Sequence, residues 1–538
     1  MGTRVKVVYD KVTDRGDRRV RSWLKLATAA AILGLPQARA AEQTLRVIAH
    51  ADLKVLDTTA NTTYITNRYG YLVYDTLFGL NSKFEPQPQM VDTWSVSADA
   101  LTWTFVLRPG QTFHDGAAVT AADCIASLKR WMVRDAMGQI LASRIASFEA
   151  VDASTFKMNL TEPYALVLET FGRWGVPPFM MPEKIASAPI GEQVTSSIGS
   201  GPFIMKRDEW RPGSKVVYIR NPNYVPRKEP PDYMAGGKVA KLDRVEWHYI
   251  TDANTALSAL MTGEMDYYEL PPLDFIGLLK DNPEITVRII DKLGVQQFIR
   301  PNSLFPPFDH FKARQALLYL ASQEEYNQAV VGNPDLYMKF CGALFMCGSD
   351  NDTDVGAVKT PDIAKAKALL AEAVYKGEKL VVLQPTDRPP YNAATMVMVE
   401  KLRAAGVNVD LQPADWSTIS IRRARKDPPD KGGWNIVITG HGGPDAANPG
   451  SNYWIGSNCE KANIGWACDP KLQALIAAWS HEPDRAKRRA LIPALQEQAY
   501  TSVPYAPMGQ FFQPIAYRKN VTGVLEAGMP VYWNVEKK

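Results

Sequence analysis

The residue types that act in catalysis or metal binding do not cluster into recognisable motifs along this chain. The glycine-rich stretches 199–201 and 440–444 do not form a phosphate- or nucleotide-binding loop. The sequence also lacks a G-x-S-x-G nucleophile elbow and an H-E-x-x-H zinc helix. We therefore expect a binding protein rather than an enzyme, with no cofactor and no bound metal. The histidines, which could act as bases or metal ligands, lie far apart, at His50, His114, His248, His310, His441 and His481.

The cysteines indicate disulfide bonds rather than a metal site. Cys341 and Cys347 lie six positions apart, and Cys459 and Cys468 nine apart, each pair within a loop-like stretch. No C-x2-C pair is present, so the spacing does not match zinc motifs. In an oxidising compartment we expect two local disulfides. Cys124 falls in a helical pattern, and we expect it to be a buried free thiol.

An export signal occupies the start of the chain. A basic stretch precedes the apolar run 26–35, and Ala38-Arg39-Ala40 provides a cleavage site. We expect a signal peptide over residues 1–40, removed near Ala40, and a periplasmic protein. The run is too short to span a bilayer, which requires about 20 residues. Val20-Arg21 resembles a twin-arginine signal that lacks one arginine, so the export route stays open.

The charge and composition of the remaining chain exclude several classes of partner. The net charge of +4 for 538 residues includes nine basic and three acidic residues within positions 1–40. The mature part therefore carries −2, which does not suit nucleic acid or an anionic membrane. Its composition, 46% hydrophobic and 22% charged, is that of a globular protein with about three packed units.

Strand and helix patterns alternate along the mature chain and predict a mixed α/β sheet. Residues 244–270 read as strand, helix and strand, and 379–385 and 434–440 read as buried strands. We expect Thr120 to cap a helix over 120–135 and Asp415 to cap another. A hairpin is predicted over 148–160, with its turn at 152–154.

Seven segments occur in order along the mature chain: 74–81 (YDTLFGLN), 91–130, 199–203 (GSGPF), 221–224 (NPNY), 259–267 (ALMTGEMDY), 306–326 and 503–509 (VPYAPMG). Together they resemble the family 5 solute-binding proteins of ABC transporters, the peptide- and nickel-binding group. The resemblance implies an α/β, two-lobed periplasmic binding protein fold with a hinge and an inserted domain. Lobe I would comprise 42–62, 192–295 and 505–538, the inserted domain 63–191, and lobe II 296–504.

Within lobe II the resemblance is closest to the dipeptide-binding members. Arg388, in the stretch 387–392, matches the arginine that grips the ligand carboxylate in those members. Asp445, in the loop 440–449, matches the aspartate that binds the peptide α-amino group. The cysteine loop from Cys459 to 466–469 also resembles theirs. A zwitterionic dipeptide needs one cation and one anion of this kind when it is desolvated.

The remaining candidate contacts follow from position. Trp416, Trp434, Tyr453 and Trp454 are expected as pocket walls, and His441 as a further contact beside Asp445. Thr63 and Tyr64 lie where lobe I meets the inserted domain, near the cleft in relatives.

We therefore expect the receptor of an ABC importer, monomeric, that binds a small peptide, most simply a dipeptide, and delivers it to a membrane permease. Asn448, Pro389-Pro390 and the extra Ala467 depart from the family pattern near the pocket. A non-peptide solute such as an opine or a nickel chelate therefore stays open, although nickel would need a histidine cluster. An exported hydrolase and a chaperone-like binder are more distant alternatives.

Overall fold

The computed structural model describes residues 42–60 and 63–538. The predicted signal peptide over 1–40 lies outside the described residues. The chain divides into two units, Met1–Glu42 and Gln43–Lys538, and the second contains every helix and strand of the described residues. Among the residues described, no helix has the length and apolar character needed to cross a membrane.

A mixed sheet of seven strands forms the first layer of this unit, in the order β12-β18-β11-β1-β10-β9-β8. Strand β1 lies between β10 and β11 and runs parallel to both, so these three strands end at the same edge. Helix α6 (Ala253–Thr262) connects β10 to β11, which confirms the predicted strand, helix and strand. The strands are β1 (Thr44–Ile48), β8 (Phe203–Met205), β9 (Lys215–Arg220), β10 (Arg244–His248), β11 (Tyr267–Tyr268), β12 (Ile285–Arg288) and β18 (Ile515–Arg518).

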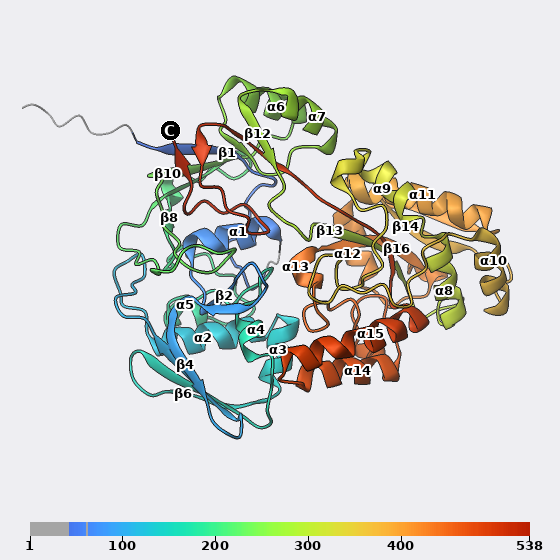
Figure 1. Cartoon of the computed structure of the whole chain (residues 1–538), viewed down its shortest axis with the longest axis horizontal. Coiled ribbons are helices and arrows are strands. Elements are labelled where there is room, and N and C mark those ends of the chain that lie inside the picture. The colour runs from blue at the N-terminus through green and yellow to red at the C-terminus, as the bar shows by residue number, and fades with distance from the viewer. Residues whose placement is uncertain (1–41, 61–62) are drawn as a thin grey trace, which may run out of the picture. The chain divides into compact units, whose positions relative to one another are not determined.

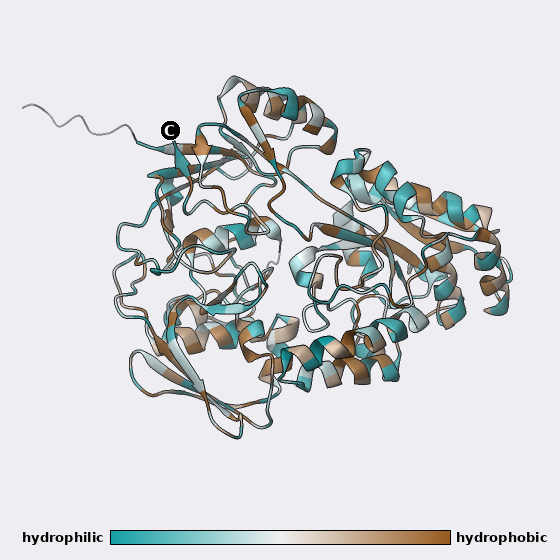
Figure 2. Ribbon diagram, viewed as in Figure 1, coloured by the Kyte–Doolittle hydropathy of each residue, from teal (hydrophilic) through white to brown (hydrophobic). Residues whose placement is uncertain are grey.

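The second sheet has five strands in the order β15-β14-β16-β13-β17. Strand β14 is parallel to β15 and β16, while β13 is antiparallel to β16 and β17. Helices lie around these strands in Figure 1, and Figure 2 shows the strands coloured as hydrophobic, as expected where helices cover a parallel sheet. The strands are β13 (Val295–Pro301), β14 (Leu380–Pro385), β15 (Val409–Ala414), β16 (Ile436–Gly442) and β17 (Ala506–Phe511).

The helices of this second half include α11, whose apolar side packs on β14, and α12, which follows β15. Asp415 accepts a hydrogen bond from the Thr418 N–H at 3.0 Å, which confirms it as the cap of α12. The helices from α8 onward are α8 (Phe311–Leu320), α9 (Gln323–Val331), α10 (Ile363–Glu372), α11 (Pro389–Ala404), α12 (Trp416–Arg423), α13 (Gly443–Ala446), α14 (Pro470–His481) and α15 (Arg485–Ser502).

A four-stranded antiparallel sheet in the order β4-β5-β7-β6 falls within residues 91–160. Its predicted hairpin is confirmed, with the Ser154 N–H bound to the Asp152 carboxylate at 2.7 Å in the turn. Thr120 and Asp123 cap helix α2 reciprocally, also as predicted. The elements are β4 (Val91–Val96), β5 (Thr102–Leu107), β6 (Ile145–Ala150), β7 (Thr155–Leu160), α2 (Ala121–Met132), α3 (Ala136–Ala142), α4 (Val167–Phe171) and α5 (Glu183–Ala186).

Short elements complete the unit: α1 (Tyr64–Val73), α7 (Ile276–Asp281), β2 (Phe78–Leu80), β3 (Pro86–Pro88), β19 (Val521–Thr522) and β20 (Glu536–Lys537). The chain passes between the first and second sheets at 289–294 and again at 512–514. The prediction assigned residues 505–538 to lobe I. Strand β17 lies within that segment but belongs to the second sheet, so the chain returns to the first sheet only after Phe511. The remaining domain boundaries stay a prediction.

Both predicted disulfides are present, joining Cys341 to Cys347 and Cys459 to Cys468. Cys124 is a buried free thiol, as expected, and packs within α2 against the apolar core.

A buried ion pair ties three distant segments together. Asp57 is fully buried and accepts hydrogen bonds from the Thr59, Ala60 and Val194 N–H groups at 2.9 Å each. Its remaining partner is the Arg130 guanidinium on α2, at 3.1 Å. Burial acts to raise the pKa of Asp57, but these hydrogen bonds lower it overall.

We predict that Asp57→Ala destabilises the fold by about 3–5 kcal/mol, because it leaves the Arg130 charge buried without its carboxylate. The measurement is the shift of the urea unfolding transition at pH 7. Asp274→Ala, at an exposed position, is the matched control and should change stability by less than about 0.5 kcal/mol. Equal shifts for both variants would contradict the role assigned to this pair.

Candidate functional site

Three neighbouring parallel strands of the second sheet have their carboxyl ends at the same edge, and candidate side chains follow each of them. Parallel β15, β14 and β16 end at residues 414, 385 and 442, and Trp416, Arg388 and Asp445 follow within a few residues. The carboxyl ends of parallel strands are where α/β sheets bind ligands. The two charged residues predicted from the sequence therefore come to the same edge.

The parallel strands of the first sheet contribute a second polar group at their carboxyl ends. His50 follows β1 and Glu269 follows β11. The buried Glu269 carboxylate lies 2.6 Å from His50 Nδ1 and 2.6 Å from the Arg68 guanidinium, and it also accepts the Tyr532 hydroxyl. Burial acts to raise the pKa of Glu269, but Arg68 and the hydrogen bonds lower it to about 2. Burial and Arg68 lower the pKa of His50.

A cavity of about 110 Å³ lies between these two edges. His50, Arg68 and Glu269 line it from the first sheet, and Gly442 lines it at the end of β16. Arg388 and Asp445 lie beyond its walls, but both interact electrostatically with residues that line it. The wall residues are His50, Tyr64, Arg68, Trp174, Glu269, Leu270, Ile290, Asp291, Gly294, Val295, Gly442, Gln513, Ile515, Gly528, Met529 and Pro530. We call this cavity, together with Arg388, Tyr391, Asp445 and Tyr453, the inter-sheet site.

Asp445 is held at this site with an incomplete set of partners. Its carboxylate lies against Gly175, where a Cβ atom would fall 2.1 Å from Oδ2, so only glycine fits there. Its nearest cation is Arg173 Nε, 3.9 Å from Oδ1, and Arg173 itself is paired with Asp135. Oδ1 is buried and has no hydrogen-bond partner among the described residues. Burial raises the pKa of Asp445, and Arg173 offsets only part of that rise.

Arg388 presents the opposite charge without a counter-ion. It precedes the first turn of α11, is exposed, and makes no side-chain hydrogen bond or ion pair within the described part of the chain. Its positive charge acts on His50 from the first sheet and on Tyr391 from its own helix. The guanidinium is thus available to a ligand near both sheets.

Tyr64 is an aromatic residue that lines the cavity and contacts residues of both halves of the site. It is 44% exposed, its ring lies 6.3 Å from that of Trp174, and its hydroxyl reaches Gly442 of the second sheet. Burial of the hydroxyl and the Asp445 charge raise its pKa. Thr63 precedes it as the N-cap of α1. Tyr453 is 42% exposed, and burial of its hydroxyl and the Asp445 charge raise its pKa as well.

The other predicted aromatic contacts divide into two groups. Trp416 is half-buried and lies 5.1 Å from the Tyr391 ring, close to the inter-sheet site. Trp434 is fully buried, and its indole N–H donates to the Arg423 carbonyl, so it has no surface to offer a ligand. Trp454 is 4% exposed and packs on Phe298 in the core. We therefore correct the prediction for Trp434 and Trp454, because core packing covers both rings.

His441 also points into the core. Its ring lies 5.0 Å from Phe298, and Nε2 lies 3.2 Å from the Gln296 side chain. Burial lowers its pKa to about 3, so the ring is neutral at physiological pH. Over residues 42–60 and 63–538, no group of three or more His, Cys, Asp or Glu side chains is placed to hold a metal ion.

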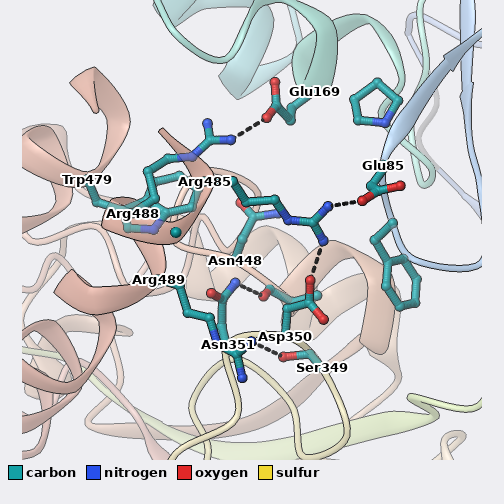
Figure 3. A pocket seen from close by; sticks show the side chains of 14 residues that line it. Glu85, Glu169, Ser349, Asp350, Asn351, Asn448, Trp479, Arg485, Arg488 and Arg489 are labelled. Atoms are coloured by element: carbon teal, nitrogen blue, oxygen red, sulfur yellow. Dashed lines mark hydrogen bonds and ion pairs between the residues drawn. The ribbon is translucent and has the colours of Figure 1, made fainter. Parts of the chain in front are cut away.

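A larger pocket of about 410 Å³ lies elsewhere, between α15 and the segment around Glu85 (Figure 3). Arg485 is paired there with Glu85 and Asp350, and Arg488 with Glu169 at 2.7 Å. Arg489 also lines this pocket and has no ion-pair partner among the described residues, but every carboxylate of the pocket is already paired. The inter-sheet site instead has both an unpaired arginine, Arg388, and a carboxylate without a close cation, Asp445. Charge complementarity therefore favours the inter-sheet site despite its smaller cavity.

Comparison with known proteins gives a family for this arrangement. Residues 85–463, more than half of the chain, match the description "Bacterial extracellular solute-binding proteins, family 5 Middle". A probable peptide ABC transporter periplasmic-binding protein of Sinorhizobium fredii is 41% identical over 520 residues, covering 95% of this chain and 97% of that protein. The chain belongs to family 5 of the extracellular solute-binding proteins.

Solved structures show that this family 5 protein has the two-lobed periplasmic binding protein fold. A binding protein, AgaA, from A. tumefaciens R10 in complex with agropinic acid matches with a TM-score of 0.77 at 21% identity, covering 92% of this chain and 99% of that one. A dipeptide-binding protein from Pseudoalteromonas sp. SM9913 in complex with Met-Leu matches with a TM-score of 0.75 at 22% identity, covering 92% and 100%. These relatives are described as binding proteins rather than enzymes.

Sequence reasoning missed several residues in or beside the inter-sheet site. His50 and Glu269 directly follow buried strands, which is a signal that could have found them. Arg173 and Asp291 carry no such signal. Asp291 lies in the crossing segment 289–294, where burial raises its pKa to about 7.

We predict that Glu269→Gln lowers stability at pH 7 by about 3–5 kcal/mol, because Arg68 loses its buried counter-ion. The lowered pKa of Glu269 means that its contribution is complete above about pH 4.5, the ordinary value, and is lost as the pH falls from there toward about 2. Urea unfolding of both proteins between pH 7 and 3.5 should therefore show a steeper acid loss in the wild type. Glu264→Gln, at an exposed position, should retain the wild-type slope. Parallel slopes for the wild type and Glu269→Gln would contradict this role.

Proposed function

We propose that the protein is the periplasmic receptor of an ABC importer and that it binds a small peptide, most simply a dipeptide, in the inter-sheet site. The observation that carries the proposal is the pair of unmatched opposite charges, the buried Asp445 carboxylate and the unpaired Arg388 guanidinium. A zwitterion with its charges at the two ends matches this pattern. The described peptide function of the Sinorhizobium fredii relative supports it.

The chemistry assigned to each residue is simple. Asp445 would accept the α-ammonium group, whose charge offsets the cost of burying this carboxylate. Arg388 would hold the α-carboxylate through two parallel hydrogen bonds, the geometry that guanidinium favours. Because both ends are fixed, a longer peptide would place its carboxylate beyond Arg388. Selection for length would then arise from leaving a charge unpaired.

Binding would be coupled to movement of one half of the molecule against the other. The inter-sheet site draws residues from both sheets, and the chain crosses between them at 289–294 and 512–514. A ligand that contacts both sheets favours the closed arrangement by its differential affinity for that state. The closed, loaded receptor would then present its ligand to a membrane permease.

We predict that the refolded, ligand-free mature protein binds Ala-Ala and does not bind N-acetyl-Ala-Ala. Acetylation removes the ammonium group and leaves Asp445 without its cation. Isothermal titration calorimetry measures both affinities. If neither compound binds, the receptor takes a non-peptide solute, and mass spectrometry of the ligand carried through purification identifies it.

We predict further that Asp445→Asn and Arg388→Gln each weaken Ala-Ala binding by roughly thirtyfold or more, because each leaves one end of the zwitterion unpaired at a cost of about 2–5 kcal/mol. Asp430→Asn and Arg425→Gln make the same charge changes at exposed positions and should leave the affinity unchanged. Equal losses in the site variants and their controls would refute the assignment of the two ends.

A further inference from the structure

Arg423, at the end of α12, is a second arginine beside the inter-sheet site. Its guanidinium lies 4.7 Å from the Trp416 ring centroid and 5.9 Å from that of Trp454. Nη1 donates to the Thr439 hydroxyl on β16 at 3.3 Å. Two indole rings and a hydroxyl therefore hold the side chain in place.

Arg423 has no carboxylate partner within residues 42–60 and 63–538, and its buried Nε makes no hydrogen bond there. Its nearest titratable neighbours are the phenols of Tyr391 and Tyr453. Other arginines of this segment are satisfied: Arg422 donates to the Gly432 and Gly433 carbonyls, and Arg425 pairs with Asp427 at 2.6 Å. Arg422 therefore also lacks a carboxylate partner, but two carbonyls accept its hydrogen bonds, whereas the buried Nε of Arg423 has no acceptor.

Arg423 and Arg388 act on the same part of the site. Burial raises the pKa of Tyr391, and both guanidinium groups oppose that rise, so both lie near its hydroxyl. Arg423 also lies close to Tyr453, which in turn lies close to Asp445. Ring contacts agree with this placement, because Arg423 stacks on Trp416, which lies 5.1 Å from Tyr391, and lies 5.9 Å from Trp454, which is 5.1 Å from Tyr453.

Arg423 remains without a counter-ion when the charges of the site are paired. Arg68 has Glu269, and Arg173 has Asp135 and the more distant Asp445. Arg388 and Arg423 have no carboxylate of their own. Two carboxylates lack a close cation, Asp445 and Asp291, and burial raises the pKa of Asp291 to about 7. A neutral zwitterion would pair with Asp445 and Arg388 and leave Arg423 without a counter-ion.

We propose that the inter-sheet site selects a ligand with a second carboxylate, an acidic dipeptide whose Asp or Glu side chain is bound by Arg423. This inference rests on the proposed function and specifies its ligand class. The unpartnered Nε is buried in this structure, so the side chains that cover it must move before a ligand carboxylate can bind to the parallel donors of the guanidinium. Its planar face stacks on Trp416, which fixes the direction of those donors.

The test is calorimetric titration of the refolded, ligand-free protein with Ala-Ala and with two matched pairs, Ala-Glu against Ala-Gln and Glu-Ala against Gln-Ala. Glutamine has the size of glutamate without its charge. We expect at least one acidic peptide to bind about ten- to a hundredfold more tightly than its amide partner, the range for hydrogen bonds to charged groups.

Arg423→Gln should reduce that ratio to near one, and Arg423→Lys should retain part of it. Arg425→Gln, the control on the neighbouring surface, should leave the ratio unchanged. Circular dichroism and the melting temperature verify that each variant folds. A loss of affinity that is equal for acidic and amide peptides in Arg423→Gln would assign the residue a structural role and overturn the inference.

The outcomes separate the two proposals. If Ala-Ala and the amide peptides bind as tightly as the acidic ones, the acidic preference is refuted and the peptide receptor stands. If none of the five peptides binds, the proposed function is refuted and the acidic preference falls with it.

Discussion

The buried carboxylate of Asp445 is the constraint on which the rest of the site depends. It lies against Gly175 with only a distant and already paired cation, Arg173, so its charge is only partly compensated by the protein. Placing a carboxylate in such surroundings costs free energy unless a cation joins it. This cost is the reason for the proposal that a positively charged group of the ligand binds there.

The same reasoning explains why two sheets are needed. Each has parallel strands whose carboxyl ends deliver polar residues, His50 and Glu269 from one and Arg388 and Asp445 from the other. On the first sheet these charged groups form ion pairs with one another. On the second sheet Arg388 and Asp445 do not pair with each other. The first sheet therefore contributes a paired, stable group to the site, and the second contributes the charges proposed to bind the ligand.

Membership in family 5 accounts for the fold but does not decide the solute. Matching structures contain agropinic acid in one case and Met-Leu in another, on folds with TM-scores of 0.77 and 0.75 to this chain. Ligand class is therefore set by individual side chains rather than by the architecture. We propose that in this chain it is set by Asp445, Arg388 and Arg423, the side chains that lack a close partner of opposite charge.

The sequence by itself determined the local features and the family. Helix caps at Thr120 and Asp415 and both disulfides depend on residues close together in the chain, and their short spacing made them predictable. The family resemblance also suggested Arg388 and Asp445, whose role in ligand binding stays a prediction. Only the tertiary structure decided which distant residues meet and which are covered. His50 and Glu269 are 219 positions apart and become partners because β1 and β11 are neighbours in one sheet. Trp434 and Trp454 are as aromatic as Trp416, yet two separate core clusters cover them. Exposure and charge pairing depend on the order of strands and the covering of faces, which arise from interactions across the whole chain rather than from any local pattern.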